Sequence, residues 1–222
     1  MKDKVVAVVG GAGFIVRYLV RELCKKGVSV NVGCRDTESA KFLRSIGVVV
    51  LVNLIKVNVA NYDQMARLIE GADHVISLVG ILHETKGNTF ETVQAKGPML
   101  VGKIAREKNV RSLVHVSAIG ADVNSKSLYA SSKGLGETYI RDEFEKTVIL
   151  RPSIIFGPDD NFFNRFANLA AFAPFLPLIG GGTTKFQPVY VQDVASAIML
   201  SLIHISEPTR QEAISYAVFC LK

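Results

Sequence analysis

VVAVVGGAGFIVRYLVREL, residues 5–23, is the stretch that decides the fold. Its first five residues are apolar and mostly β-branched, which predicts a strand covered on both faces. Gly10 would allow a sharp turn, and Gly13, which lacks a Cβ, would let a diphosphate approach the N–H groups at the positive end of a following helix. A strand, a glycine turn and a helix in this order predict a dinucleotide site. The alternative that the spacing leaves open is a tight turn without a ligand.

Val16 stands where dinucleotide-binding turns of this spacing usually have a third glycine. Its isopropyl group has to fit between helix and sheet, and unrelieved overpacking would cost roughly 1–3 kcal/mol. We therefore expect a smaller facing residue or a slightly raised helix. Weaker cofactor binding is the other consequence that this residue leaves open.

The composition is that of a single folded domain. The 222 residues are 49% hydrophobic and 21% charged, which suffices for a large core. Basic residues exceed acidic ones by 26 to 20, a formal charge of +6, but they are scattered along the expected helix faces. We expect no nucleic-acid partner, while an acidic partner or an anionic membrane surface stays open.

The cysteines and the apolar runs bear on location. Cys24, Cys34 and Cys220 are odd in number and lack metal-ligand spacing, so we expect a reducing compartment and no metal site. Met1–Lys4 leads directly into the first strand, and we expect no signal peptide or transit sequence. The longest apolar run, residues 166–179, is too short for a transmembrane segment.

Strand-like and helix-like segments alternate along the chain, which predicts an α/β fold of the Rossmann type, a doubly wound parallel sheet with helices on both faces. Asn61 and Gln64 resemble a capping box for a helix that ends at Ile69. Asp193 is the expected cap of a last helix, and the run Val48–Val52 is ambiguous. Further strands are expected at 28–32, 54–59, 74–79, 113–117 and 148–150, and helices at 37–46 and 89–108.

Arg35 lies just beyond the second expected strand, where such folds place the group that reads the adenosine ribose. A carboxylate there would accept from a 2′-hydroxyl, whereas a guanidinium can pair with a 2′-phosphate. NADP(H) is therefore favoured over NAD(H), although Asp36 is adjacent. Asn58 could bond the adenine edge with Val59 against the ring, or Asn58 could simply be a turn residue.

Tyr129 and Lys133 form a second chemical signal, because residues four apart share one face of a helix. The ammonium would lie near the phenol and lower its pKa, so that Tyr129 could act as a general acid or base. Lys133 could also bond the nicotinamide ribose. Alone the spacing is common by chance, but here it follows a glycine turn and Ser117.

These motifs resemble those of the extended short-chain dehydrogenases/reductases, the group that contains NAD-dependent epimerases and dehydratases. Longer runs are similar to the atypical branch that includes the alpha subcomplex subunit 9 of respiratory complex I. The resemblance extends over about residues 4–200. The runs are FIVRYLV (14–20), SLVGIL (77–82), HVSAIGA (115–121), RPSIIFG (151–157) and QPVYV (187–191).

The resemblance implies site residues by position. Gly10, Gly13, Phe14 and Ile15 would meet the pyrophosphate. Leu78, Val79 and Gly80 would lie under the adenosine side, Ser117 could contact the nicotinamide, and Pro152, Ser153 and Ile154 would flank it. The hydroxyl that active members use to polarise a substrate carbonyl aligns with Ala118, and loss of such a donor typically costs ~10²–10³ in rate.

Two functions follow from the resemblance. The first is a structural or assembly subunit of complex I that holds NADP(H). The second is an active oxidoreductase or sugar-nucleotide epimerase/dehydratase that uses Tyr129 and Lys133. The protein would be cytoplasmic in a bacterium, with peripheral attachment to the inner membrane possible, or on the matrix side of a mitochondrion.

The C-terminal end departs from the resemblance. We expect a dinucleotide-binding domain with the start of a substrate-side region at 1–203, and a non-native tail at 204–222 that resembles translated sequencing-adapter DNA. A short native helix and strand is the alternative. If the tail is non-native, a further substrate-side or partner-binding portion is missing from this sequence. Aromatic residues expected in core or interface rather than in ligand stacking are Phe162, Phe163, Phe166, Phe172 and Phe175, beside the Gly180–Gly182 loop.

Overall fold

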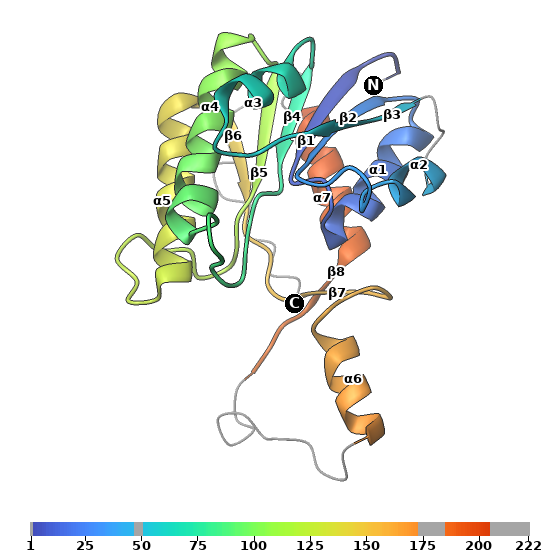
Figure 1. Ribbon diagram of the computed structural model, residues 1–222, viewed down its shortest axis with the longest axis vertical. Helices are drawn as coiled ribbons and strands as arrows, with labels where there is room; N and C mark the ends of the chain where they lie inside the picture. The colour runs from blue at the N-terminus through green and yellow to red at the C-terminus, as the bar shows by residue number, and fades with distance from the viewer. Residues whose placement is uncertain (1, 47–50, 173–184, 205–222) are drawn as a thin grey trace.

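The computed structural model describes residues 2–46, 51–172 and 185–204 (Figure 1). The expectations for Phe175, the Gly180–Gly182 loop, most of the Val48–Val52 run and residues 205–222 fall outside these ranges, so they stay predictions. The division into a domain and a tail stays a prediction as well.

Six parallel strands form the main sheet, in the order β3-β2-β1-β4-β5-β6. β1 lies between β2 and β4, and the strand order runs outward from it in both directions, so the sheet is doubly wound as predicted. Such a reversal of strand order opens a crevice at the carboxyl ends of the strands, where ligands bind in open α/β sheets. The strands are β1 (Val5–Val9), β2 (Ser29–Cys34), β3 (Val52–Lys56), β4 (His74–Ser77), β5 (Ser112–Val116) and β6 (Thr147–Leu150).

Helices cover both faces of this sheet (Figure 1). One face carries α1 (Phe14–Lys25), α2 (Phe42–Ile46) and α7 (Val191–His204). The other carries α3 (Tyr62–Ile69), α4 (Gly97–Glu107) and α5 (Leu128–Glu143), with the π-helix η2 (Glu91–Lys96) leading into α4. Within the described residues, none of the helices is both long and apolar enough to cross a membrane.

The apolar run of β1 explains why both layers form. Val6 and Val8 point into the cluster under α1 and α7, whereas Ala7 and Val9 point into the cluster under α3 and α4. All four are completely buried. Alternate side chains of one strand therefore supply both cores, as expected for a strand covered on both faces.

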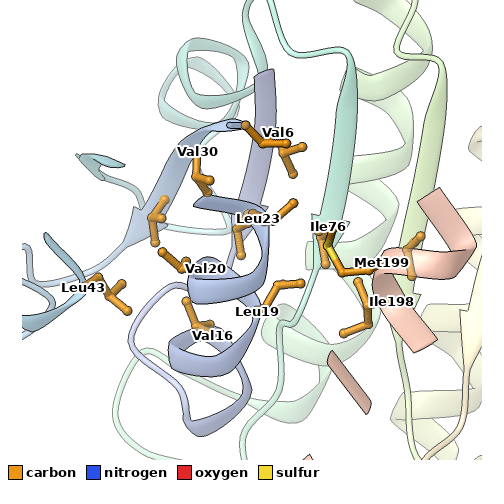
Figure 2. Close-up of a cluster of buried hydrophobic side chains, with 14 of the residues drawn as sticks. Val6, Val16, Leu19, Val20, Leu23, Val30, Leu43, Ile76, Ile198 and Met199 are labelled. Atoms are coloured by element: carbon orange, nitrogen blue, oxygen red, sulfur yellow. The ribbon is translucent and has the colours of Figure 1, made fainter. Parts of the chain in front are cut away.

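Val16 is accommodated in the first of these cores. Its side chain is 1% exposed and belongs to the same buried cluster as Leu19, Val20 and Ile198 (Figure 2). The valine that replaces the third glycine is thus a core residue of α1. Its methyl groups add apolar burial at the contact between helix and sheet.

Several sequence-based boundaries are corrected by the structure. The helix expected at 89–108 is divided, because Pro98 has no N–H for the regular ladder and the chain passes through a π-helical stretch before α4. The helix expected at 37–46 is regular only in α2. Asp193 lies in the first turn of α7 instead of capping it, since α7 begins at Val191.

The capping box is half confirmed. Asn61 Oδ1 accepts the N–H of Gln64 at 3.0 Å, as a helix cap should. The Gln64 side chain, however, accepts from the N–H of Asn58 at 2.8 Å instead of returning to Asn61. The glutamine therefore ties the end of β3 to α3.

A smaller part lies beyond the carboxyl edge of the sheet (Figure 1). It contains the two-residue strands β7 (Ile155–Phe156) and β8 (Val189–Tyr190), which pair in parallel, and the helix α6 (Phe163–Phe172). Phe156, Phe162 and Phe163 form a chain of edge-on aromatic contacts between these elements.

Candidate dinucleotide site

The turn between β1 and α1 is fixed by the end of β2. Gly10 has φ +98°, which only glycine adopts readily. The N–H groups of Gly10 and Gly11 both donate to the Gly33 carbonyl, at 3.2 and 2.8 Å. A Cβ on Gly11 would lie 2.1 Å from Val32 Cγ1. The sequence analysis assigned no role to Gly11, yet it is the glycine on which the turn packs most closely.

The N-terminus of α1 is open. Gly13 is the N-cap residue and offers no side chain to the first-turn N–H groups, and this turn has no acidic residue. A Cβ on Gly13 would have only Gly10 O within 4 Å, at 3.8 Å. The first-turn amides and the positive end of the helix dipole therefore face space that a diphosphate can enter.

A cavity of about 950 Å³ begins at this helix end and continues along the carboxyl edge of the sheet. It is lined by Gly10 and Gly13 from the turn and by side chains from five further segments. Sequence-predicted residues on its wall are Gly10, Gly13, Phe14, Ile15, Leu78, Gly80, Ser117, Tyr129, Lys133, Pro152, Ser153 and Ile154. The structure thus brings most of the predicted positions to one place.

Four predicted residues do not line the cavity. Arg35 is exposed beyond β2, and Val59 is half-buried against the core under α3 and α4. Asn58 is exposed, and its Oδ1 accepts the N–H of Ala60 at 3.0 Å, which is the turn role weighed as its alternative. Val79 is 3% exposed and contributes its carbonyl instead of its side chain.

Lys133 is buried on α5, with 4% of its surface exposed. Its Nζ donates to the Val79 carbonyl at 3.2 Å. Burial lowers the pKa of Lys133 to about 8, although the Glu137 carboxylate opposes this shift. The amine therefore stays largely protonated at neutral pH and sits directly behind Gly80.

Tyr129 behaves differently from its prediction. Burial raises the pKa of its phenol above the ordinary 10.0, so the expected lowering by Lys133 is wrong. The Lys133 ammonium donates to the Val79 carbonyl. The Tyr129 ring packs edge-on against the Phe90 ring, with 6.0 Å between the ring centroids. At neutral pH, Tyr129 is a protonated phenol on the cavity wall, suited to donate a proton and not to accept one.

Ser117 leaves a buried hydroxyl without a partner. Its backbone N–H donates to Leu150 O at 2.8 Å, but its Oγ has no hydrogen-bond partner among the described residues. The residue is 5% exposed and lines the cavity. An unpaired buried hydroxyl is costly, so it fits a polar ligand group. Next to it, Ala118 lines the cavity with a methyl group.

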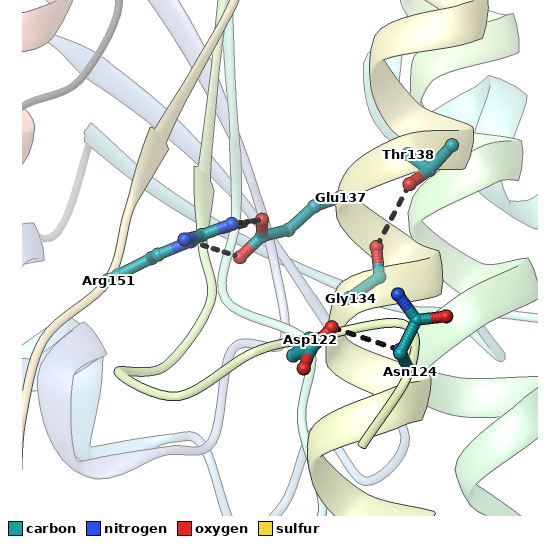
Figure 3. A network of polar contacts seen from close by, with 6 residues as sticks. All are labelled: Asp122, Asn124, Gly134, Glu137, Thr138 and Arg151. Carbon is teal, nitrogen blue, oxygen red and sulfur yellow. Dashed lines mark hydrogen bonds and ion pairs between the residues drawn. The ribbon is translucent and has the colours of Figure 1, made fainter.

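A part-buried ion pair and a buried amide lie beside the site, and neither was predicted from the sequence. Arg151 Nε donates to both Glu137 oxygens, at 2.9 and 3.1 Å (Figure 3). Gln94, fully buried on η2, donates to Ser132 Oγ at 3.1 Å. No spacing in the sequence signals this ion pair, because it joins α5 to the residue that follows β6.

The outer wall of the cavity is mainly apolar. One side comes from Ile81, Leu82 and Ile119 at the ends of β4 and β5. The other comes from one face of α6 and the residue before it, with Phe162, Phe166 and Leu169. Leu82 is 81% exposed, which is unusual for a leucine. Two of the phenylalanines expected in core or interface thus face the cavity instead.

The residues present fit a dinucleotide. The uncapped α1 N-terminus suits a pyrophosphate, and the ammonium of Lys133 and the unpaired Ser117 hydroxyl lie further along the same cavity, where a ribose and a nicotinamide amide need donors and acceptors. When bound, such a group would supply or take up hydride. The side chains here bind it and orient it, and Tyr129 holds a proton nearby.

Comparisons with known proteins agree with this geometry. Residues 6–216 match the NAD dependent epimerase/dehydratase family, a range that runs into the C-terminal segment set apart above. The mitochondrial NADH dehydrogenase (ubiquinone) 1 alpha subcomplex subunit 9 of Arabidopsis thaliana is 36% identical over 200 residues, which are 89% of this chain and 50% of that protein. The chain spans about half the length of the subunit 9 relatives it matches.

Two further likenesses differ in function. The ceramide reductase of Caulobacter vibrioides is 30% identical over 213 residues, 93% of this chain and 65% of that protein. The UDP-glucuronic acid 4-epimerase of Bacillus cereus, solved with NAD, has a TM-score of 0.76 at 21% identity and covers 90% of this chain and 74% of its own. From the family match over nearly its whole length, the chain belongs to the NAD-dependent epimerase/dehydratase family, whose fold binds a nicotinamide dinucleotide.

Proposed function

We propose that this chain holds a nicotinamide dinucleotide as a structural or assembly subunit of the respiratory NADH:quinone oxidoreductase. The proposal is carried by the cavity at the α1 N-terminus, on whose wall Ala118 stands where, by the resemblance, active members have the hydroxyl that polarises a substrate carbonyl. The similarity to the subunit 9 relatives supports it. A tightly held ligand stabilises the fold by mass action, by about 2.7 kcal/mol at a concentration a hundred times its dissociation constant.

Native purification tests this role. The chain, purified from its own cells without added nucleotide, is expected to carry a stoichiometric dinucleotide and to migrate with the NADH-oxidising complex on a native gel. Deletion of its gene is expected to reduce the amount of that complex. A chain that carries the dinucleotide but migrates alone, with the complex unchanged after deletion, contradicts the subunit role and leaves the binding role standing.

The same proposal includes a preference for NADP(H). Asp36, the acid that could read a ribose hydroxyl, uses Oδ1 to accept the N–H of Glu38 at 2.9 Å. Arg35 is exposed at the end of β2, the strand on which the glycine turn rests. Arg35→Ala is expected to weaken NADPH binding about tenfold, the loss of one charge-assisted contact, and to leave NADH binding unchanged. Equal losses for both ligands contradict the preference.

A second candidate is an oxidoreductase, favoured by one observation. Tyr129 and Lys133 both reach the cavity, next to an outer wall of apolar side chains. This wall suits the reduction of a carbonyl on an apolar chain better than a sugar nucleotide, and the likeness to a ceramide reductase agrees with it. Turnover of NADPH with a long-chain ketone, abolished in Tyr129→Phe with binding intact, supports this candidate. Retention of NADPH without turnover on ketones or UDP-sugars contradicts it.

The location forms part of the proposal. The relatives named above as complex I subunits are mitochondrial proteins. We propose a peripheral position at the inner membrane, on the cytoplasmic side in a bacterium or the matrix side in a mitochondrion. Fractionation after a carbonate wash tests it, because a peripheral protein is released and an integral one is retained.

A further inference from the structure

One carboxylate, that of Glu137, connects two segments that line the cavity. Lys133 and Glu137 are four residues apart on α5, so they share a helix face, and they are only 4% and 6% exposed. Arg151 follows β6 directly and contacts Glu137 through two nitrogens, Nε and Nη2 (Figure 3). The Glu137 carboxylate therefore joins α5, which also carries Lys133, to the segment that continues into Pro152.

A carboxylate in this position does two things. It compensates charge, because it brings a negative charge to the buried ammonium of Lys133 and to the part-buried guanidinium of Arg151. It also anchors the chain after β6, since a bidentate contact fixes the direction of the arginine. Among the described residues, no carboxylate is within ion-pair distance of the Lys133 ammonium, whose hydrogen bond goes to the Val79 carbonyl.

We propose that Glu137 is a positioning residue of the dinucleotide site: its charge keeps the buried Lys133 in the ammonium form, and its contact with Arg151 holds Pro152–Ile154 at the nicotinamide end. The inference rests on the proposed function, because only a bound dinucleotide makes use of both effects. Glu137 touches neither ligand nor reacting atoms and acts through Lys133 and Arg151.

The surroundings of Lys133 make its ionisation observable. From β5, His115 faces it, and burial lowers the pKa of that imidazole to about 3. On α5 itself, Tyr129 has a pKa above its ordinary value, and the Glu137 carboxylate raises the pKa of Lys133 against the effect of burial. The remaining neighbours, Gln94 and the Val79 carbonyl, do not titrate. Lys133, with a pKa of about 8, is therefore the group of this cluster that titrates between neutral and moderately alkaline pH.

The test is a titration of Lys133 by NMR in the full chain with 13C-labelled lysine, assigned with Lys133→Arg. The wild-type signal is expected to titrate near pH 8. In Glu137→Gln the midpoint is expected to fall by roughly one pH unit, the effect of removing a nearby opposite charge. NADPH affinity, followed by fluorescence, is expected to decline with rising pH at the same midpoint in each protein.

Three variants separate charge from structure. Arg151→Gln breaks the same ion pair but keeps the carboxylate, so its midpoint is expected at or above the wild-type value while NADPH affinity falls at every pH. Glu137→Asp keeps the charge and is expected to restore most of the midpoint. Glu143→Gln, on the same helix as Glu137, removes the ion pair with Arg106 of α4, in which nitrogen and oxygen are 2.7 Å apart, and is expected to leave the midpoint unchanged.

The outcomes are distinct. An unchanged midpoint in Glu137→Gln, or an equal decrease in Arg151→Gln, overturns the proposal because Glu137 would then be an anchor only. If Glu137→Gln does not fold, the midpoints of the Lys133 titration in Arg151→Gln and Glu137→Asp still test the charge effect. A wild-type chain that binds no NADPH defeats the proposed function, whereas the Lys133 titration reads the charge effect without any ligand.

Discussion

The six-stranded sheet and the smaller part beyond its carboxyl edge differ in how they are held together. In the sheet, β1 supplies two cores with four completely buried residues, and the glycine turn rests on backbone bonds to β2. The smaller part consists of two-residue strands and α6, on which Phe163 and Leu169 are each 41% exposed. The glycine turn is therefore fixed by the sheet, while the described residues of the smaller part are held by short strands and a half-exposed helix.

The largest expected effect is a loss of stability in acid, which originates in a buried histidine of the six-stranded sheet. Burial, assisted by the Lys133 charge, lowers the pKa of His115 to about 3, below the ordinary 6.5. In the unfolded chain the His115 imidazole binds a proton below about pH 6.5, whereas in the folded chain it binds this proton only below about pH 3. The free energy of unfolding thus falls as pH decreases through this window, by up to roughly 5 kcal/mol.

The variant His115→Gln isolates the contribution of this histidine to the pH dependence of stability. The variant cannot take up the proton, so its stability should depend less steeply on pH in urea unfolding between about pH 6.5 and 4. Asp73, whose pKa is lowered mainly by its bonds to Val5 and Lys4 against an opposing desolvation, contributes equally in both proteins. Identical slopes would show that the histidine is not buried in the neutral form.

Replacing Val16 tests whether the substituted glycine position is part of the core. Val16→Gly is expected to lower the free energy of unfolding by about 2.5–4 kcal/mol, from lost apolar burial and a glycine inside a helix. Leu169→Gln, on the half-exposed face of α6, is expected to change it by less than about 0.5 kcal/mol. Similar values for the two variants would remove the contrast between the two regions.

Substitutions at two glycines of the turn test stability and dinucleotide binding separately. Gly10→Ala is expected to cost roughly 1–3 kcal/mol, because the residue has a positive φ and its new Cβ would meet the backbone of Leu78 at 3.0 Å. Gly13→Ala has open space and is expected to cost less than about 1 kcal/mol while it weakens NADPH binding. Thermal unfolding and ligand fluorescence measure both. Normal NADPH affinity in Gly13→Ala would place the pyrophosphate elsewhere.

The fold could be predicted from sequence because its signals are local. The β1 run, Gly10 and Asn61 each act within a few residues, and the structure places them as predicted. Pro98 is also a local signal, but the π-helical conformation of the residues before it is known only from the backbone of the structure. The division into η2 and α4 was therefore missed.

The chemistry of the site was less predictable because it depends on burial. The spacing of Tyr129 and Lys133 indicated a shared helix face, but the shift of the phenol pKa follows from desolvation, which no spacing reveals. The ion pair of Glu137 and Arg151 joins a helix to the end of a strand. The close approach of Gly11 to Val32 likewise exists only once β1 and β2 are paired.

Calorimetric titration of the folded chain with NADPH and NADH tests the central claim, that the open N-terminus of α1 and the cavity behind it hold a nicotinamide dinucleotide. Saturable binding of one dinucleotide per chain is expected, tighter for NADPH than for NADH and weakened in Gly13→Ala. The absence of any heat of binding with reduced or oxidised forms of either dinucleotide would contradict it.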